Sequence, residues 1–338
     1  MNISVISFTA RGRALGARIA ACLPEARVTQ YARAEGFEPY ASLDAFARRA
    51  MAEDGAVIFV GATGIAVRAV APYVRGKDVD PAVLAVDENG RFVIPLLSGH
   101  IGGANRLAEQ LAAQLGAVPV ITTATDGRGV FAADSWAVQH GCAVAETGEI
   151  KHISGALLRG EEVGLRSEFP ICGALPAGVT TAGQPDNGIL ISIYEREARP
   201  FAHTLRLVPR IVHIGVGCRR GLPPDRLCAR VHEIWAQLGL SRRAAASVAS
   251  IDLKADEPAV LELARAWDVP ARFYTAAELD AVPGDFPPSA FVREKTGTDN
   301  VCQRAAARAA RGGRCLLEKT AGDGVTVSMY CENWRIEF

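Results

Sequence analysis

The sequence has little lysine, no paired cysteines and no long apolar run. Its eight cysteines are scattered over 338 residues without a CxxC pair, which excludes a disulfide framework and a zinc ribbon. Free thiols are typical of a reducing compartment, so we expect a cytoplasmic protein. Apolar stretches such as residues 55–66 fall far short of the roughly 20 residues that span a bilayer. The first residues enter a strand-like run rather than a signal peptide, so no membrane association is expected.

The charges balance over the whole chain but not along it. The 37 basic and 37 acidic residues exclude the polycationic surface typical of nucleic-acid-binding proteins. Residues 201–250 contain eight arginines and two acidic residues, a local excess of six positive charges. Two interpretations stay open: a solvated surface, or a face for a partner with several carboxylates or phosphates.

Strand and helix patterns alternate in the first and last thirds of the chain. A length of 338 residues suggests two or three domains. Residues 1–133 and 209–338 each alternate short apolar strands with helices, and Asn89-Gly90 between two apolar runs predicts a β-hairpin. Residues 134–208, rich in glycine and proline, predict a small, less regular middle domain. The predicted fold class is therefore α/β, with two α/β domains with largely parallel sheets joined by this middle domain.

Three glycine-rich turns follow predicted strands, where open α/β sheets bind their ligands. The first, Gly61-Ala62-Thr63-Gly64, opens a helix that contains Arg68. Backbone amides at such a helix start favour an anion, although glycine turns of this kind are also common for steric reasons.

The second turn is the run Leu97-Ser98-Gly99-His100-Ile101-Gly102-Gly103-Ala104-Asn105. An ordinary strand-to-helix turn needs one or two glycines, so three glycines beside a histidine indicate close approach of the backbone to a ligand. Histidine is the side chain best suited to proton transfer near neutral pH, although a lone histidine is more often structural.

The third turn is Gly215-Val216-Gly217-Cys218-Arg219-Arg220-Gly221. Its GxGxxxG spacing is one residue longer than the dinucleotide fingerprint, and no acidic residue lies between Glu233 and Asp252 to bind a ribose. It is better interpreted as an anion-facing loop. Only five basic residues in the chain are lysine, and Lys254 and Lys319 follow strands in similar contexts, as expected of sites that need a compact ammonium group. The absence of phosphate-loop, GxSxG and HExxH motifs excludes the corresponding hydrolase classes.

Several of these runs together resemble the CbiG family of anaerobic cobalamin biosynthesis. In the N-terminal third, the resemblance is carried by Gly61 to Arg68, Lys77 to Val83, Val86 to Glu88 and Pro95 to Asn105. In the C-terminal third, which is also similar to the stand-alone CobE-type domain, it is carried by Gly215 to Gly221, Ser250 to Lys254 with Glu257, Phe273 to Leu279, Thr296-Gly297 and Asn300 to Cys302. One departure is Gln303, where the family often has glutamate.

The resemblance implies a hydrolase that opens the δ-lactone of cobalt-precorrin-5A and releases acetaldehyde, giving cobalt-precorrin-5B. Such a substrate is a cobalt-containing tetrapyrrole macrocycle ringed by carboxylates, which arginine can bind bidentately. The cobalt belongs to the substrate, so we expect no cofactor and no protein metal site. Other enzymes of the corrin pathway are candidate partners. The alternative function is a non-catalytic corrinoid carrier or chaperone.

Hydrolysing a lactone needs an activated water and a place for negative charge on the carbonyl oxygen. We expect His100 to be the general base, with Ser98 and Asp80 as further catalytic candidates, amides of the second turn as oxyanion donors, and Asp126 and Asp252 as alternative bases. The expected substrate contacts are Thr63, Gly64, Arg68, Lys77, Gly99, Gly102, Gly103 and Asn105 in the N-terminal domain, and Gly215, Gly217, Cys218, Arg219, Arg220, Ser250, Lys254 and Lys319 in the C-terminal domain.

Overall fold

The computed structural model describes residues 1–77, 79–195 and 199–338, and for residues 125 and 126 the backbone alone. The chain divides into two compact units, residues 1–139 with 157–159, and residues 140–156 with 160–338. Both are built from helices and largely parallel sheets, so the predicted α/β class is confirmed. The three-domain boundaries stay a prediction. Over the described part of the chain, no helix has the length and apolarity needed to cross a membrane.

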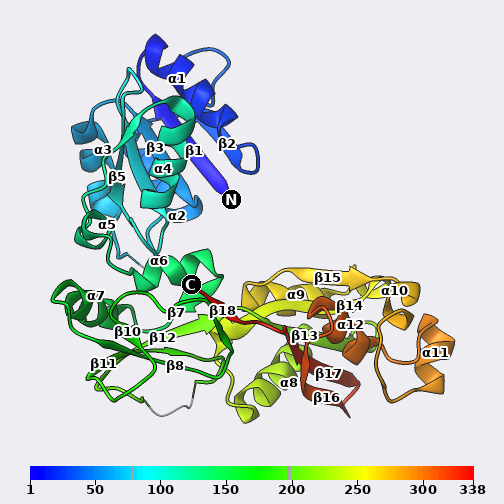
Figure 1. The fold of residues 1–338 in the computed structure, drawn as a ribbon. Coiled ribbons are helices and arrows are strands. Elements are labelled where there is room, and N and C mark those ends of the chain that lie inside the picture. Colours follow the sequence, from blue (N-terminus) through cyan, green and yellow to red (C-terminus); the bar gives the residue numbers. More distant parts are fainter. Residues whose placement is uncertain (78, 196–198) are drawn as a thin grey trace. The chain divides into compact units, whose positions relative to one another are not determined.

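The first unit is built on a six-stranded sheet with the strand order β2-β1-β3-β4-β5-β6 (Figure 1). Its elements are β1 (Asn2–Ser7), α1 (Ala10–Ala21), β2 (Arg27–Tyr31), α2 (Leu43–Glu53), β3 (Ala56–Val60), α3 (Thr63–Val70), β4 (Ala82–Val86), β5 (Phe92–Leu97), α4 (Ala104–Leu115), β6 (Val118–Pro119), α5 (Ala124–Arg128) and α6 (Ala133–Gln139). Strands β1 to β4 are parallel, β5 is antiparallel to β4, and β6 is parallel to β5.

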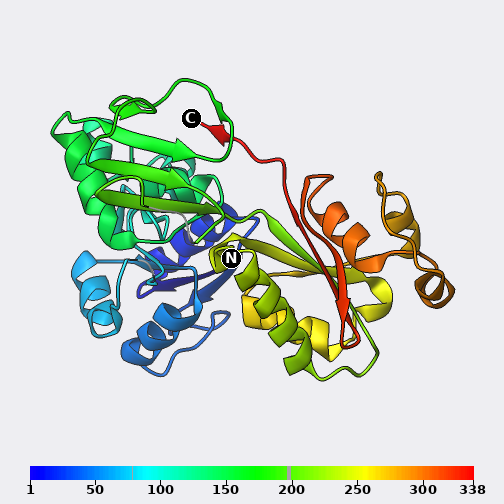
Figure 2. The ribbon, with the colours of Figure 1, turned by 90° about the horizontal axis from the view of Figure 1, so that it is seen from below.

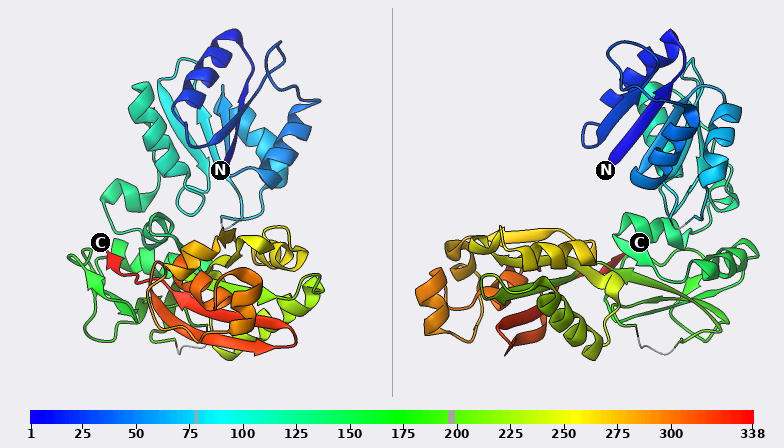
Figure 3. Two further views of the ribbon diagram at one scale, coloured as in Figure 1. Left: turned by 90° about the vertical axis from the view of Figure 1, so that its right-hand side faces the viewer. Right: turned by 180° about the vertical axis from the view of Figure 1, so that it is seen from behind.

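Helices cover both faces of this sheet (Figure 3). Apolar residues of α1 and α4, including Leu15, Ile19 and Leu111, pack on one face, and residues of α2 and α3, including Phe46, pack on the other. The strand residues between them, such as Ile58, are completely buried. A sheet covered on both faces explains why its strands are continuous apolar runs in the sequence.

The predicted hairpin joins β4 and β5 and determines where the following turn lies. The Asp87 carboxylate accepts hydrogen bonds from the backbone amides of Asn89, Arg91 and Phe92, and Gly90 adopts a φ of 68°. Because the hairpin reverses the chain, the end of β5 lies beside the beginning of β4. We call the edge where β1, β3 and β4 begin the amino edge, and the opposite one the carboxyl edge.

The second unit begins with a sheet that is more regular than the glycine-rich sequence indicated. Its strand order is β10-β8-β11-β12-β7, and β7 alone of these is antiparallel to its neighbour. The elements are β7 (Cys142–Val144), α7 (Ile150–Leu158), β8 (Val163–Ser167), β9 (Ile171–Cys172), β10 (Val179–Thr180), β11 (Asn187–Ile191) and β12 (His203–Pro209).

The rest of the second unit is a five-stranded sheet with the strand order β15-β14-β13-β17-β16. Strands β13 to β15 are parallel, and β17 is antiparallel to both β13 and β16. The elements are β13 (Val212–Cys218), α8 (Pro224–Gln237), β14 (Ala245–Ile251), α9 (Pro258–Trp267), β15 (Ala271–Tyr274), α10 (Ala276–Asp280), α11 (Ala290–Thr296), α12 (Val301–Ala309), β16 (Arg314–Gly322), β17 (Val325–Cys331) and β18 (Ile336–Glu337).

The C-terminal residues form a small sheet of their own with a strand of the middle segment. After β17 the chain runs on to β18, which pairs in parallel with β9 in a separate two-stranded sheet (Figure 2). In the C-terminal sheet, α12 packs on β13, β14 and β17, while α8 and α9 pack on each other. The carboxyl ends of β13, β14 and β15 lie at one edge, which therefore collects the loops that follow them.

Candidate functional site

The turn between β5 and α4 lies at the amino edge of the N-terminal sheet, and its glycines are required by its own packing. A Cβ on Gly102 would lie 2.4 Å from the Cβ of Ser98, and one on Gly99 would lie 2.8 Å from Oδ1 of Asn105. Gly103 precedes α4 with a φ of 79°, a conformation that favours glycine. Close packing of the turn thus accounts for the three glycines, and their predicted contact with a substrate stays a prediction.

The backbone amides at the start of α4 are used inside the turn. Gly103 donates to the carbonyl of His100, Ala104 to that of Ser98, and Asn105 to that of Gly99. Of the three glycine amides expected to stabilise an oxyanion, that of Gly103 already has an acceptor, and the expected role of the Gly99 and Gly102 amides stays a prediction. The turn is tight and internally bonded, which holds the His100 backbone firmly in place.

His100 is paired with a buried carboxylate that sequence reasoning missed. Its Nδ1 lies 3.1 Å from Oδ2 of Asp134, the second residue of α6. The Asp134 side chain is 4% exposed and that of His100 17%. Because the carboxylate accepts at Nδ1, the proton sits on that nitrogen and Nε2 keeps its lone pair. This is the arrangement in which a histidine can take a proton from water.

The other catalytic candidates, Ser98 and Asp80, lie at the same edge. Ser98 has a φ of 56°, and no described group hydrogen-bonds to its buried hydroxyl. The carbonyl of Asp80 is next to Gly102, since a Cβ there would lie 3.3 Å from it. The Asp80 carboxylate accepts the backbone amides of Arg75 and Gly76 at 3.0–3.1 Å. Those bonds show a loop-holding function, and a catalytic role for Asp80 stays a prediction.

Two further predicted contacts differ in how they are placed. Asn105 is 9% exposed, and its Nδ2 donates to Oγ1 of Thr123 at 3.1 Å, so the side chain joins α4 to the segment before α5. Lys77 is exposed in the loop before β4, at the same edge as His100. Asp126 is outside the residues whose side chains the structure describes.

The structure does not bring the first glycine turn together with His100. Thr63, Gly64 and Arg68 follow β3 at the carboxyl edge, whereas the turn after β5 lies at the amino edge. The two edges are separated by roughly 10 Å of strand, from Val83 to Val86. Arg68 is exposed and donates to the carbonyl of Gly64 at 3.3 Å. Whether Thr63, Gly64 and Arg68 contact the same large macrocycle as His100 stays a prediction.

Four of the eight predicted C-terminal contacts meet at the edge where β13 and β14 end. Cys218 ends β13, Arg219 and Arg220 follow it, and Lys254 follows β14. Arg219 and Arg220 are both exposed. The amide of Arg219 donates to the carbonyl of Gly324, and Arg220 donates to the carbonyl of Leu253. Both guanidinium groups are open to solvent, and that of Arg220 also lies 3.7 Å from Oδ2 of Asp256.

Lys254 organises this edge through a buried carboxylate. Its Nζ lies 2.9 Å from Oε2 of Glu257, whose Oε1 accepts the amide of Gly221 at 3.0 Å. The Lys254 side chain is 15% exposed and that of Glu257 2%. Burial raises the pKa of the neighbouring Cys218 thiol, and the charge of Lys254 opposes that rise. Through Glu257, Lys254 therefore holds the loop of residues 218–221 in place, and this role is additional to any contact with substrate.

Packing accounts for two predicted contacts, Gly215 and Ser250, while contact of Lys319 with substrate stays a prediction. A Cβ on Gly215 would lie 1.9 Å from the carbonyl oxygen of Cys302, so this glycine admits α12 to the sheet rather than a substrate. Ser250 is completely buried and donates to the carbonyl of Val216. Lys319 lies within β16, away from its end. Burial raises the pKa of the Cys302 thiol, and the charge of Lys319 opposes that rise.

Two predicted positions remain, Gly217 and Asp252. Gly217 packs against Thr326, whose hydroxyl would lie 2.6 Å from a Cβ on that glycine. Asp252 is exposed and accepts the amide of Leu253. Neither observation tests the predicted roles of Gly217 in binding and Asp252 as an alternative base.

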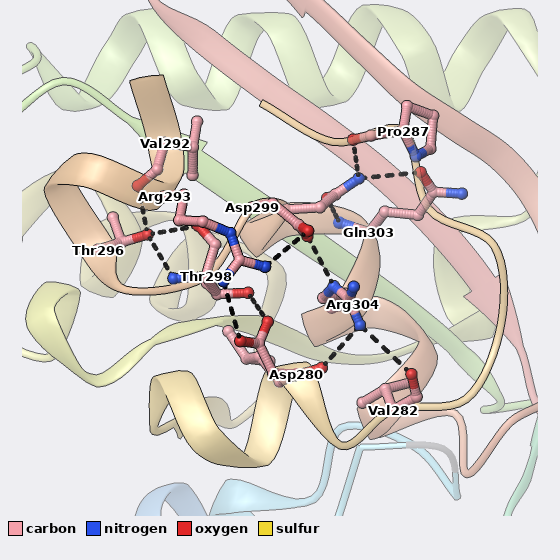
Figure 4. Close-up of polar contacts among 12 residues, drawn as sticks. Asp280, Val282, Pro287, Val292, Arg293, Thr296, Thr298, Asp299, Gln303 and Arg304 are labelled. Carbon is pink, nitrogen blue, oxygen red and sulfur yellow. Dashed lines mark hydrogen bonds and ion pairs between the residues drawn. The ribbon is translucent and has the colours of Figure 1, made fainter. Parts of the chain in front are cut away.

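The run from Thr296 to Cys302 lies where α10, α11 and α12 meet, and its side chains and their neighbours connect these helices (Figure 4). Arg304 donates to the carboxylate of Asp299 and to carbonyls at the end of α10, and Thr298 donates to Asp280 at 2.6 Å. The pKa of the Asp299 carboxyl is lowered, first by its hydrogen bond with Arg293. This network is a fixed support for the sheet rather than a reacting centre.

Gln303 belongs to this support. It is 3% exposed, its amide Nε2 donates to the hydroxyl of Tyr330 at 3.3 Å, and its backbone amide is capped by Asn300. The side chain that replaces the family glutamate therefore serves a buried hydrogen bond, and nothing at this position performs acid–base chemistry.

Comparison with known proteins decides the family. The family models described as Cobalamin synthesis G N-terminal and Cobalamin synthesis G C-terminus match residues 45–126 and 212–330. The chain is 37% identical to the cobalt-precorrin-5A hydrolase of Salmonella typhimurium, with 97% of each chain covered. This chain belongs to the cobalt-precorrin-5A hydrolase family.

Other relatives agree with that assignment. The cobalt-precorrin-5A hydrolase of Priestia megaterium is 28% identical over 81% of this chain and 77% of its own. The protein CobE of a Sinorhizobium species is 37% identical over 28% of this chain and 61% of its own. Membership of the cobalt-precorrin-5A hydrolase family confirms the predicted resemblance.

Proposed function

We propose that this chain is a cobalt-precorrin-5A hydrolase, which opens the δ-lactone of its substrate and releases acetaldehyde to give cobalt-precorrin-5B. The observation that carries this proposal is 37% identity to a cobalt-precorrin-5A hydrolase over 97% of both chains. Likeness over the full length matters because the N-terminal unit, which holds the His100 turn, is included in it.

His100 is the general base of the proposed reaction. The buried Asp134 carboxylate, 3.1 Å from Nδ1, orients the imidazole, and Nε2 is the nitrogen that takes a proton from the attacking water in the proposed reaction. Water adds to the lactone carbonyl, and collapse of the tetrahedral intermediate breaks the ring C–O bond, leaving a carboxylate and a hydroxyl. A base then removes the proton of that hydroxyl, and the freed electron pair forms the C=O bond of acetaldehyde. The C–C bond to the macrocycle breaks in the same step, and its electrons pass to the macrocycle.

The substrate's carboxylates are bound by exposed cations. Arg219 and Arg220 follow β13 in the loop that Lys254 and Glu257 support. A guanidinium group binds a carboxylate with two parallel hydrogen bonds, which suits a ligand ringed by acetate and propionate groups. Lys77, exposed at the amino edge of the other sheet, is a further candidate contact near His100.

The proposal also covers the metal, the cellular location and the partners of the reaction. The only metal that the proposed reaction involves is the cobalt of the substrate, and the chain's own side chains supply the acid–base chemistry. All eight cysteines are free thiols, which supports a working location in the cytoplasm. Corrin-pathway enzymes that make or consume the substrate are candidate partners.

Anaerobic incubation of the purified chain with cobalt-precorrin-5A tests the proposal. We expect one acetaldehyde per substrate consumed and a macrocycle of correspondingly lower mass. The carrier alternative predicts binding of the macrocycle, seen as a change in its visible spectrum, with no acetaldehyde above the enzyme-free rate. The CobE relative covers only 28% of this chain, so likeness to it says nothing of the His100 turn.

A further inference from the structure

Two histidines and a glutamate meet in the middle sheet, in the part of the chain that the proposed reaction does not use. Glu149 immediately precedes α7, His152 lies in the first turn of that helix, and His203 is the first residue of β12. One ligand atom from each lies within 4.8 Å of the others. Among the described residues, this is the one group of three or more such side chains. We call it the Glu149–His152–His203 cluster.

The geometry of the cluster goes beyond a simple ion pair. Nδ1 of His203 lies 3.2 Å from Oε2 of Glu149, and the rings of His152 and His203 are stacked with centroids 3.8 Å apart and planes 7° apart. An ion pair would need only one of these imidazoles. The near-parallel planes hold the in-plane lone pairs of the two rings in separate layers, so one imidazole must turn out of the stack before a nitrogen of each can face the same ion.

We propose that this cluster binds a divalent transition-metal ion of the Zn²⁺ class. Two imidazoles and one carboxylate suit Zn²⁺, Co²⁺ or Ni²⁺, whereas Mg²⁺ and Ca²⁺ prefer oxygen ligands and softer ions prefer thiolates. Three protein ligands leave at least one coordination position for water. The ion is separate from the substrate's cobalt, and the proposal does not depend on the hydrolase activity.

The side chains can reach the spacing that an ion requires. Ligand atoms about 2.0–2.1 Å from a tetrahedral Zn²⁺ lie roughly 3.3 Å from one another. Closing from 4.8 Å or less needs a torsional change that turns one imidazole out of the parallel stack. The side chains of His203 and Glu149 are 42% and 23% exposed, so both have room to move and an ion can enter from solvent.

Titration of chelator-treated, untagged protein with Zn²⁺ in a calorimeter tests this site. We expect one ion per chain, with a rise in melting temperature that a chelator reverses. In the His152→Ala/His203→Ala double variant, affinity should fall at least about a hundredfold, because loss of a mere hydrogen-bond partner of a ligand already costs ten- to a hundredfold. The matched control is His232→Ala, which removes an exposed imidazole of α8.

Each outcome decides the proposal. Binding lost in the double variant and kept in His232→Ala supports it. Binding that persists in the double variant overturns it, because that variant keeps all eight thiols and the ion must then lie elsewhere. Failure of the unmodified protein to bind Zn²⁺ or Co²⁺ at micromolar concentration also overturns it. Should the double variant not fold, Glu149→Gln and His152→Ala singly should each weaken binding at least tenfold, and unchanged affinity in both overturns the proposal.

Discussion

Replacing His100 by glutamine tests whether the imidazole acts as a base or only supports its turn. Glutamine has an amide that can still donate to the Asp134 carboxylate, so the contact between the turn and α6 is preserved. The turn itself is held by backbone hydrogen bonds and by its glycines, which the substitution leaves in place. What glutamine cannot do is accept a proton from water, because an amide has no basic nitrogen.

The expected loss of activity follows from what a positioned general base contributes to the reaction rate. General-base catalysis contributes typically 10²–10⁴-fold, or about 3–5 kcal/mol of barrier. His100→Gln should therefore lose at least about a hundredfold in acetaldehyde release while binding the substrate with near-normal affinity. Asp134→Asn should also lose activity, because an amide donating to Nδ1 moves the ring proton to Nε2, where the lone pair is needed. His232→Gln, an exposed imidazole of α8, is the control and should leave the rate unchanged.

Single-turnover acetaldehyde release and a binding titration, each made on all four proteins, separate the possibilities. A near-normal rate in His100→Gln would refute the assignment of His100 as base. A changed visible spectrum of the substrate bound to His100→Gln, with the rate unaltered, would instead assign His100 as an axial ligand of the cobalt. A variant that fails to bind and melts at a lower temperature would indicate a structural role.

Three further predictions concern the C-terminal sheet. Arg219→Ala should weaken substrate binding roughly tenfold or more, since a charge-assisted hydrogen bond contributes about 1.5–3 kcal/mol, and unchanged affinity by titration would contradict the proposed contact. Lys254→Arg should lower activity nearly as much as Lys254→Ala, because the planar guanidinium group is too large for the buried position beside Glu257. Full activity in the arginine variant would show that Lys254 is only a surface charge. The pKa of Glu332 is lowered, first by its hydrogen bond with His213, so the stability it contributes is present above the ordinary value of 4.5 and is lost as the pH falls through the lower folded value. Urea unfolding at a series of pH values should show a shallower loss below pH 4.5 for Glu332→Gln than for the unmodified chain, and identical slopes would contradict this.

The sequence predicted the local structure of the N-terminal unit well, and the reason is visible in the hairpin. Asn89-Gly90 between two apolar runs signals a turn with a positive φ, and the structure has Gly90 at 68° with β4 and β5 antiparallel. Helix α4 begins at Ala104, because the preceding glycines form the turn. Short-range signals of this kind need only neighbouring residues.

The same hairpin determines which edge of the sheet each glycine turn occupies. Because a hairpin reverses the chain, the turn after β5 lies at the opposite edge from the turn after β3. This places His100 at the amino edge and Arg68 at the carboxyl edge. The hairpin was itself predicted, so the separation of the two edges could have been derived from the sequence.

Other features could not have been predicted from spacing. Asp134 lies 34 residues beyond His100, and no local pattern marks it as the partner of the imidazole. Gly215 looked like a ligand contact, but only the packing of α12 explains it. The middle sheet is built from short parallel strands such as β8 and β10, whose pairing depends on residues far apart in the sequence.

Incubation with cobalt-precorrin-5A in water enriched in ¹⁸O tests the central claim most directly. If water attacks the lactone carbonyl, the product carries one ¹⁸O atom in the newly formed carboxylate, with one acetaldehyde released per label incorporated. Mass spectrometry of the macrocycle reads the label even though acetaldehyde exchanges its own oxygen with water. Release of acetaldehyde with no label in the carboxylate, or binding with no acetaldehyde at all, would contradict the assignment of this chain as a lactone hydrolase.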